Sequence, residues 1–361
     1  MDKMNEKRLA NVIAEMKKQG LSQILVTDDN ALLWLIGRKI MPFERCGALL
    51  IKDNGEVHAF MNNLFCFEPM EGMTMHYFAD GDDPYKMIAD ELAPGEVGFD
   101  NNWASKHTIS VLNKRSDIIP ALGSAPVDVC KSHKDEAEKD ALRHAANIND
   151  MAVEFGIKHI DPEVDELTLS NMIEKFFEDH GAVQDIQNQL VCYGKNGASP
   201  HHYATAGEML KDGDAVLFDL WAPIDNYWCD MTRTVFYKSC SDEHRKLYEI
   251  VKNAQQTAID FVRPGVKMSD VDAAARKVIT DAGYGEFFLT RTGHGVGMTV
   301  HEPPEASPSN DMIAEPGMCF SIEPGIYLKN DIGIRIEDLV IVTEDGCEVL
   351  TKYPKDLQIV Q

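Results

Sequence analysis

Four acidic residues of this 361-residue chain lie in or beside apolar, strand-like runs. Asp219, Glu323 and Glu337 each stand within such a run, and Asp230 opens another. Burying an isolated carboxylate is unfavourable unless a partner neutralises it. An ion pair or a strand end would explain one such acid, whereas four together require a shared positive charge. Lys and Arg are scarce around them, which favours a bound metal.

His294 offers a nitrogen ligand for the same predicted site. Glycines flank it in the segment Gly293-His294-Gly295, and glycine lets a backbone approach a ligand closely. The segment lacks the Lys-Ser/Thr ending of a phosphate-binding P-loop, and the alternative is a glycine-rich loop with a hydrogen-bonded histidine. One imidazole and four carboxylates suit Mn, Co, Fe or Zn, and their charge suits two divalent ions.

The period of two along a strand predicts which groups orient these ligands. Arg335 should share a face with Glu337, and Thr232 and Thr234 should share a face with Asp230. Hydrogen bonds from such neighbours hold metal ligands in position. The alternative for the two threonines is ordinary strand propensity.

Apolar periodicity divides the chain into an α/β domain over residues 1–129 and a second domain over 130–361. In the first domain we expect a helix at 4–18 and a strand at 23–27. We also expect a hairpin of strands 47–51 and 57–61, and two short strands at 97–99 and 126–129. In the second domain we expect four helices among strands, at 132–156 with Ser132 as its cap, 168–180, 242–261 and 269–282.

Composition argues against several classes of partner. The net charge of −24, from 35 basic and 59 acidic residues, repels nucleic acid and anionic lipid. No apolar run approaches the roughly 18 residues of a membrane helix, and the start of the sequence lacks an apolar signal segment. We therefore expect a cytoplasmic protein. Its eight cysteines form no C-x-x-C pair and are expected to be free thiols.

The acidic and histidine segments together resemble the pita-bread metallopeptidases, the family of methionine aminopeptidase, aminopeptidase P and proline dipeptidase. The order and spacing of the motifs agree over about residues 190–355, and the start resembles the N-terminal domain of the creatinase and prolidase branch. The resemblance implies an α/β N-terminal domain followed by an α+β pita-bread catalytic domain. The motifs that carry it are Asp219 with Asp230-Met231-Thr232, Gly293-His294-Gly295, His301-Glu302-Pro303, Ile322-Glu323-Pro324 and Arg335-Ile336-Glu337.

By this resemblance, Asp219 binds one metal, His294 and Glu323 bind the other, and Asp230 and Glu337 bridge both. A hydroxide between the metals attacks the peptide carbonyl, and Glu323 carries the proton. The resemblance assigns three further residues to the substrate or to the last ligand, namely His202, His301 and Arg335. His201, beside His202, is the alternative for the first of these roles.

The resemblance further implies hydrolysis of Xaa-Pro bonds in small peptides, with Mn the first choice of metal and a homodimer as the assembly. A dipeptidase is favoured over an aminopeptidase that acts on longer peptides. Two departures keep a metal-dependent hydrolase of a small non-peptide substrate open. Trp221 replaces the glycine usual near the first ligand, and Glu305 stands where some proline dipeptidases have a carboxylate-binding arginine. A non-catalytic binding module is disfavoured because all five ligands are present.

Overall fold

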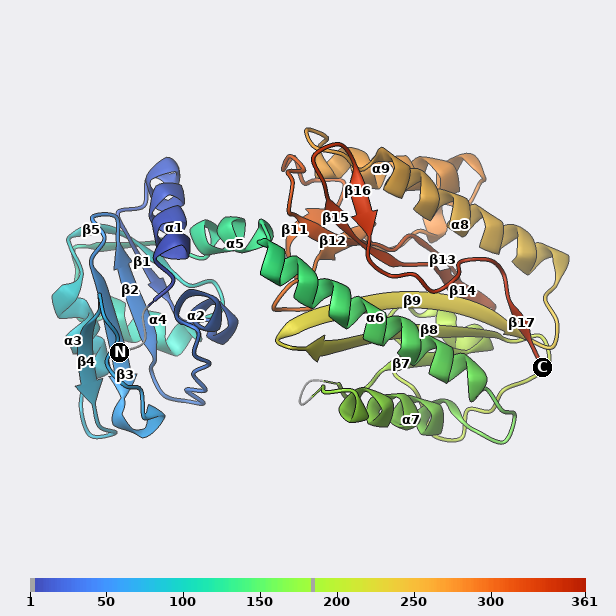
Figure 1. The fold of residues 1–361 in the computed structure, drawn as a ribbon, viewed down its shortest axis with the longest axis horizontal. Coiled ribbons are helices and arrows are strands. Elements are labelled where there is room, and N and C mark those ends of the chain that lie inside the picture. The colour runs from blue at the N-terminus through green and yellow to red at the C-terminus, as the bar shows by residue number, and fades with distance from the viewer. Residues whose placement is uncertain (1–3, 183–185) are drawn as a thin grey trace. The chain divides into compact units, whose positions relative to one another are not determined.

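The computed structural model describes residues 4–182 and 186–361, which form two compact units (Figure 1). The chain divides between Lys131 and Ser132, whereas the sequence analysis divides the domains between residues 129 and 130.

The first unit is built on a six-stranded mixed sheet in the order β4-β3-β2-β1-β5-β6. Its strands are β1 (Gln23–Val26), β2 (Ala48–Lys52), β3 (Val57–Asn62), β4 (Thr74–Phe78), β5 (Gly95–Phe99) and β6 (Ile118–Leu122). Its helices are α1 (Glu6–Gln19), α2 (Asp29–Ile36), η1 (Asn63–Phe65), α3 (Pro84–Glu91), α4 (Ser105–Leu112) and α5 (Ala125–Ser132). The β2–β3 hairpin is antiparallel, and β3 pairs with the edge strand β4 in parallel.

Most of the predicted elements of this unit are confirmed. Helix α1 ends at Gly20, which takes the left-handed conformation with φ 76° that glycine adopts without strain. The strand predicted at 126–129 is wrong, because these residues belong to α5. The alternating Val127 and Val129 resemble a strand pattern. Pro126 lies in the first turn of the helix, where backbone N–H groups have no partner within the helix, so proline costs no hydrogen bond there.

The second unit contains two larger sheets and a hairpin. Their orders are β17-β9-β8-β7, β11-β10-β12-β15-β16 and β13-β14. The strands are β7 (Leu190–Tyr193), β8 (Ala215–Ile224), β9 (Tyr227–Tyr237), β10 (Gly293–Gly295), β11 (Glu302–Ala306), β12 (Cys319–Ile322), β13 (Gly325–Leu328), β14 (Ile332–Arg335), β15 (Asp338–Val342), β16 (Cys347–Val349) and β17 (Ile359–Val360). The helices are α6 (Glu136–Lys158), α7 (Glu166–Asp179), η2 (Gly194–Ala198), α8 (Asp242–Phe261), α9 (Met268–Asp281) and η3 (Gly285–Phe287).

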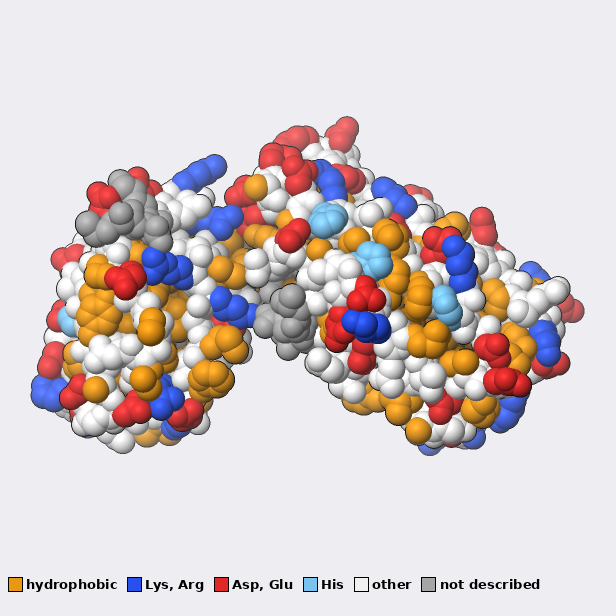
Figure 2. Space-filling model, turned by 60° about the horizontal axis from the view of Figure 1, so that its bottom comes forward, with side chains coloured by type: hydrophobic (Ala, Val, Ile, Leu, Met, Phe, Trp, Pro, Cys, Tyr) orange, Lys and Arg blue, Asp and Glu red, His pale blue; other side chains and the backbone are white. Residues whose placement is uncertain are grey.

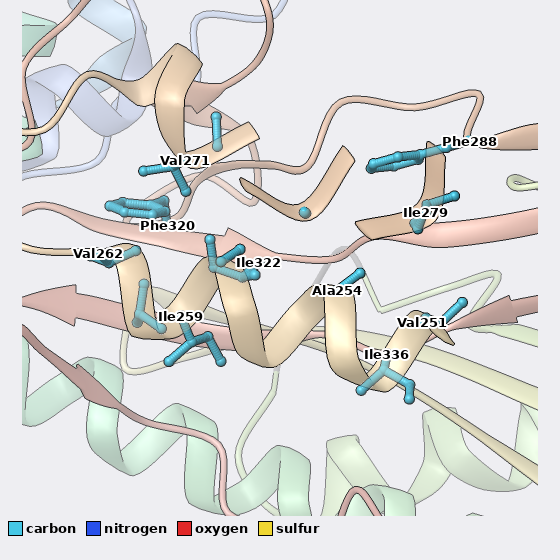
Figure 3. Close-up of a cluster of buried hydrophobic side chains, with 14 of the residues drawn as sticks. Val251, Ala254, Ile259, Val262, Val271, Ile279, Phe288, Phe320, Ile322 and Ile336 are labelled. Carbon is cyan, nitrogen blue, oxygen red and sulfur yellow. The ribbon is translucent and has the colours of Figure 1, made fainter. Parts of the chain in front are cut away.

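Two pairs of helices cover these sheets and create two cores. Helices α6 and α7 bury apolar side chains against β7, β8 and β9. Helices α8 and α9 pack with β12 and the neighbouring strands, and Figure 3 shows this core, which includes Val251, Ile259, Val271, Phe320 and Ile322. The strand ends between the cores are therefore held on both sides, and the predicted ligands lie on these strands.

The predicted helices of the second unit are confirmed, but the start of the first one is corrected. Helix α6 begins after Asp135 rather than Ser132. The Asp135 carboxylate accepts a hydrogen bond from the Glu138 N–H, and Glu138 accepts one from the Asp135 N–H. This reciprocal capping box satisfies two amides that the helix leaves unpaired.

The surface charge and the composition of the helices are relevant to the expected absence of nucleic-acid and membrane partners. On the face drawn in Figure 2, acidic side chains are dispersed among apolar and basic ones. Among the described residues, no helix combines the length and apolar character needed to cross a membrane.

Asp135→Ala should lower the free energy of unfolding by about 1 kcal/mol, because it removes the capping box of α6. Urea unfolding followed by circular dichroism measures this change. The control is Glu163→Ala, which removes an exposed carboxylate from outside the helices. Equal stabilities of the two variants would contradict the role given to Asp135.

Candidate metal centre

The register of β8 and β9 brings the first two predicted ligands together. Asp219 lies opposite Thr232, and Trp221 lies opposite Asp230, so these four side chains project from one face of the antiparallel pair. Asp230 is buried, whereas Asp219 and Trp221 are half-buried. The centre thus begins as a diagonal pair of carboxylates with an indole beside it.

His294 occupies the middle of β10, and the flanking glycines allow that short strand to fit. A Cβ atom on Gly293 would lie 1.8 Å from the Ser321 carbonyl oxygen, and one on Gly295 would lie 2.3 Å from the Glu302 carbonyl oxygen. The sequence analysis expected this close approach to be toward a ligand. The structure shows that it is toward the neighbouring strands β12 and β11.

The last two carboxylates follow strands of the same unit. Glu323 comes directly after β12, and Glu337 lies between β14 and β15. Ser321 donates a hydrogen bond to Glu323 Oε1 at 3.1 Å, and its hydroxyl accepts one from the His294 N–H at 3.0 Å. Thr232 donates to Glu337 Oε2 at 2.7 Å. One hydroxyl therefore positions each of these two carboxylates.

A buried ion pair fixes the backbone beneath the centre. The Arg233 guanidinium donates to the carbonyl oxygens of Thr232 and Glu337 and to Asp338 Oδ1, the last at 2.7 Å. Lys355 Nζ lies 2.8 Å from the other Asp338 oxygen. Because these charges are paired and hydrogen-bonded, they hold β9 against the segment that carries Glu337.

Arg335 is the cation among the ligands. Its guanidinium donates to Asp219 Oδ2 at 2.6 Å, to the Tyr327 hydroxyl at 2.8 Å and to Thr232 Oγ1 at 2.9 Å. The sequence analysis predicted that Arg335 and Glu337 share a strand face. In the structure Thr232 connects the two residues, because its hydroxyl hydrogen-bonds to both. One guanidinium does not balance four carboxylates.

The donor atoms fit a metal better than they fit one another. His294 Nδ1 lies 3.2 Å from the Gly295 carbonyl oxygen, which only accepts, so Nδ1 is the donor of this contact and Nε2 is the nitrogen that faces the carboxylates. That Nε2 lies 3.2 Å from Glu323 Oε1 and 3.5 Å from Asp230 Oδ2. Ligand atoms of Asp230, His294 and Glu337 all lie within 4.8 Å of one another. A divalent ion bound to Nε2 would be shared with these carboxylates.

Buried negative charge points the same way. Burial raises the pKa of Asp230 well above its usual range, and the charge of Glu337 raises it further. Burial likewise raises the pKa of Glu337, followed by the charges of Glu323 and Asp219. Glu337 Oε1 is buried with no hydrogen-bond partner in the described structure. Divalent ions would favour the ionised carboxylates and satisfy this atom.

The centre lies in a cavity of about 510 Å³. Its lining includes the five predicted ligands and Arg335, together with Leu190, Pro200, His201, Tyr203, Trp221, Thr290, Arg291, Val300 and His301. The His301 ring meets the His294 ring edge to face at 4.0 Å between centroids. Trp221, which replaces the glycine usual near the first ligand, lines the cavity.

The two adjacent histidines lie in different places. His202 Nε2 lies 2.9 Å from Glu166, whose fully buried carboxylate also accepts from the Tyr193 and Thr205 N–H groups. His201 lies in the cavity lining. This placement favours His201 over His202 for the substrate contact that the sequence analysis gave to His202, because Glu166 holds His202 as part of the local structure.

Arg291 is a cavity residue that the sequence analysis missed. Arg291 lies before His294 in the sequence, whereas the arginine of some proline dipeptidases would stand after it, at the position of Glu305. Arg291 Nη1 lies 3.5 Å from Glu305 Oε1, and both residues line an adjoining cavity of about 400 Å³. The usable signal was its position three residues before a predicted ligand, on a segment that must enter the site.

Orphaned polar atoms concentrate in the larger cavity. Four buried side-chain atoms lack a hydrogen-bond partner among the described residues. Three of them belong to Thr290, Arg291 and Glu337, which all line this cavity. Buried polar groups are normally paired, so these three indicate a place for a ligand.

Family profiles match most of the chain. Residues 140–344 match metallopeptidase family M24, and residues 8–127 match the creatinase/prolidase N-terminal domain.

Similar proteins agree with these matches. The sequence is 34% identical to the Xaa-Pro dipeptidase of Lactobacillus delbrueckii subsp. lactis, over 99% of each chain. The structure of dipeptidase PepE from Mycobacterium ulcerans has a TM-score of 0.91 and 31% identity, covering 98% of this chain and 97% of that one. The prolidase from Thermococcus sibiricus has a TM-score of 0.90 and 32% identity over 100% of both chains. These similarities confirm the predicted fold class.

Gly293→Ala should displace β10 and His294, because the new methyl group would meet the Ser321 carbonyl. We expect loss of bound divalent metal and a fall in peptidase activity of about 100-fold, the effect of a misplacement near 1 Å. Metal analysis and peptide hydrolysis measure both. In the control Gly346→Ala the methyl group enters open space. Unchanged metal content in Gly293→Ala would show that the strand tolerates the shift.

Proposed function

Because this chain belongs to metallopeptidase family M24, it is a peptidase, and we propose that it hydrolyses Xaa-Pro dipeptides with two divalent metal ions. The observation that carries the proposal is the convergence of a histidine and four carboxylates on one cavity that is also lined by two guanidinium groups. The Xaa-Pro dipeptidase and the prolidase named above support the choice of substrate.

Asp219, Asp230, His294, Glu323 and Glu337 would hold the two ions, and Asp230 and Glu337 would serve both of them. When bound, the ions supply Lewis-acid activation of a water molecule and of the scissile carbonyl. The fit rests on the orphaned Glu337 oxygen and on the position of His294 Nε2, which faces Glu323 and Asp230.

Other side chains of the cavity perform the remaining steps. Glu323, held by Ser321, accepts the proton of the attacking water and delivers it to the leaving proline nitrogen. His301 and His201 donate hydrogen bonds to the substrate carbonyl as it gains negative charge. Arg335 orients Asp219 through their hydrogen bond.

The cavity suits a short substrate with a free carboxylate. Arg291 offers a guanidinium in the lining, and a guanidinium binds a carboxylate through two parallel hydrogen bonds. Leu190, Trp221 and Val300 add apolar surface that suits a pyrrolidine ring. Glu305 is the ion-pair partner of Arg291 in this structure. A substrate carboxylate would take the place of this half-exposed side chain at the guanidinium. This arrangement favours dipeptides over longer peptides, whose carboxylate lies farther from the scissile bond.

Three expectations remain parts of the proposal. Manganese is the proposed metal because hard oxygen ligands predominate, while Co, Fe and Zn also suit the set. A homodimer and a cytoplasmic location are expected from the resemblance and the sequence, respectively.

A peptide panel tests the reaction. Metal-stripped protein should cleave Xaa-Pro dipeptides only after a divalent ion is restored, and should cleave Xaa-Pro-Yaa tripeptides and Xaa-Ala dipeptides less well. Glu337→Ala should lose metal uptake and hydrolysis together, because Glu337 is proposed to contact both ions. Faster cleavage of the tripeptides would favour an aminopeptidase. Normal metal content without cleavage of any peptide would favour a small non-peptide substrate.

Arg291→Gln tests the contact with the substrate carboxylate. Losing a charge-assisted hydrogen bond should lower kcat/KM for Xaa-Pro by about 10- to 100-fold, mainly through KM. Xaa-Pro-amide has the same scissile bond without the carboxylate, so its kcat/KM should not change. The control Arg263→Gln removes an exposed arginine from outside the lining. Equal losses on both substrates would assign Arg291 a structural role instead.

A further inference from the structure

A second group of potential metal ligands lies in the first unit, remote in sequence from the centre described above. It consists of His58 on β3, His76 on β4 and Glu91 at the end of α3. In the parallel pairing of β3 and β4, His58 lies opposite Thr74 and Phe60 opposite His76. The two histidines are therefore diagonal neighbours on the face that carries Phe60. Phe60 belongs to the same core cluster as Ile88 of α3, so this helix covers that face.

The ligand atoms converge on one point. His58 Nδ1 lies 3.1 Å from His76 Nε2 and 3.5 Å from Glu91 Oε2. His76 Nε2 lies 3.9 Å from Glu91 Oε1. Ligands bound tetrahedrally to zinc at about 2.0–2.1 Å stand roughly 3.3 Å apart. The first two separations match this geometry, and a small movement of the Glu91 side chain, which is one-third exposed, would supply the third.

Protons alone satisfy this arrangement poorly. If His76 donates its Nε2 proton to His58, the His58 Nδ1 lone pair also faces the Glu91 carboxylate at 3.5 Å. If His58 donates to His76, the His76 lone pair faces the same carboxylate instead. In both cases one proton lies between the two ring nitrogens, and these neutral nitrogens offer no second proton to the Glu91 carboxylate. A cation would satisfy all three groups together.

We propose that His58, His76 and Glu91 form a binding site for a zinc-like divalent cation in the N-terminal unit. Two imidazoles and one carboxylate suit zinc and exclude magnesium, which prefers oxygen ligands. Three protein ligands leave a fourth position for water. The ion ties the edge strand β4 to the end of α3, so its role is to stabilise this edge of the sheet. The site does not depend on the proposed peptidase mechanism.

Zinc content of the full chain tests the site. After equilibration with ZnCl₂ and dialysis, elemental analysis should show one zinc per chain fewer in His76→Gln than in the unaltered protein. Zinc should also raise the Tm of the unaltered protein more than that of the variant, and MgCl₂ should not reproduce the difference. Peptidase activity with saturating metal should stay unchanged in His76→Gln, because His76 lies outside the catalytic cavity.

The matched control is His107→Gln in the same unit. His107 is buried, and its ring bonds to the Tyr85 hydroxyl instead of facing a carboxylate. Glu91→Gln provides a second test that keeps both rings, and it should lose the same zinc. Equal zinc content in the unaltered protein, His76→Gln and Glu91→Gln would overturn the proposal. An equal loss in His107→Gln would overturn it as well, because the loss would then not be specific to this cluster.

Discussion

The cost of burying four carboxylates side by side governs the organisation of the catalytic unit. Burial raises the pKa of Asp230 and of Glu337, and the neighbouring carboxylates raise both further. Arg335 neutralises part of this charge through Asp219. Thr232 and Ser321 supply hydroxyl donors, but one Glu337 oxygen keeps no partner among the described residues. Such a set is stable only with added positive charge, which is why a metallopeptidase can keep it inside apolar strands.

Rigid backbone supports this arrangement. The paired strands β8 and β9 fix two ligands, and β10 fits between β11 and β12 because glycines flank His294. The buried Arg233–Asp338 pair ties β9 to the segment of Glu337. The partner of Arg291 in the cavity lining is the half-exposed Glu305. The proposed metal ligands are thus held by paired strands, whereas the proposed carboxylate contact depends on a side chain near the surface.

Local sequence signals predicted much of the secondary structure. Helix α8 has the predicted bounds, and α1, α7 and α9 differ from theirs by a few residues. The errors arose where two local readings compete. Alternating valines favour a strand at 126–129, although the tertiary context makes it a helix. Ser132 and Asp135 are both good cap residues, and only the reciprocal bonds with Glu138 identify Asp135.

The sequence by itself determined the set of candidate ligands and the resemblance to the pita-bread metallopeptidases, because residue type and spacing are local properties that persist in any fold of the chain. Tertiary structure alone decided which neighbouring side chains face the cavity. It directs His202 to Glu166 and leaves His201 in the lining, and it brings Arg291 beside Glu305. It also brings His58 and His76 together across two parallel strands. The physical reason is that strand register and helix packing set side-chain direction, and both depend on contacts between residues far apart in the chain.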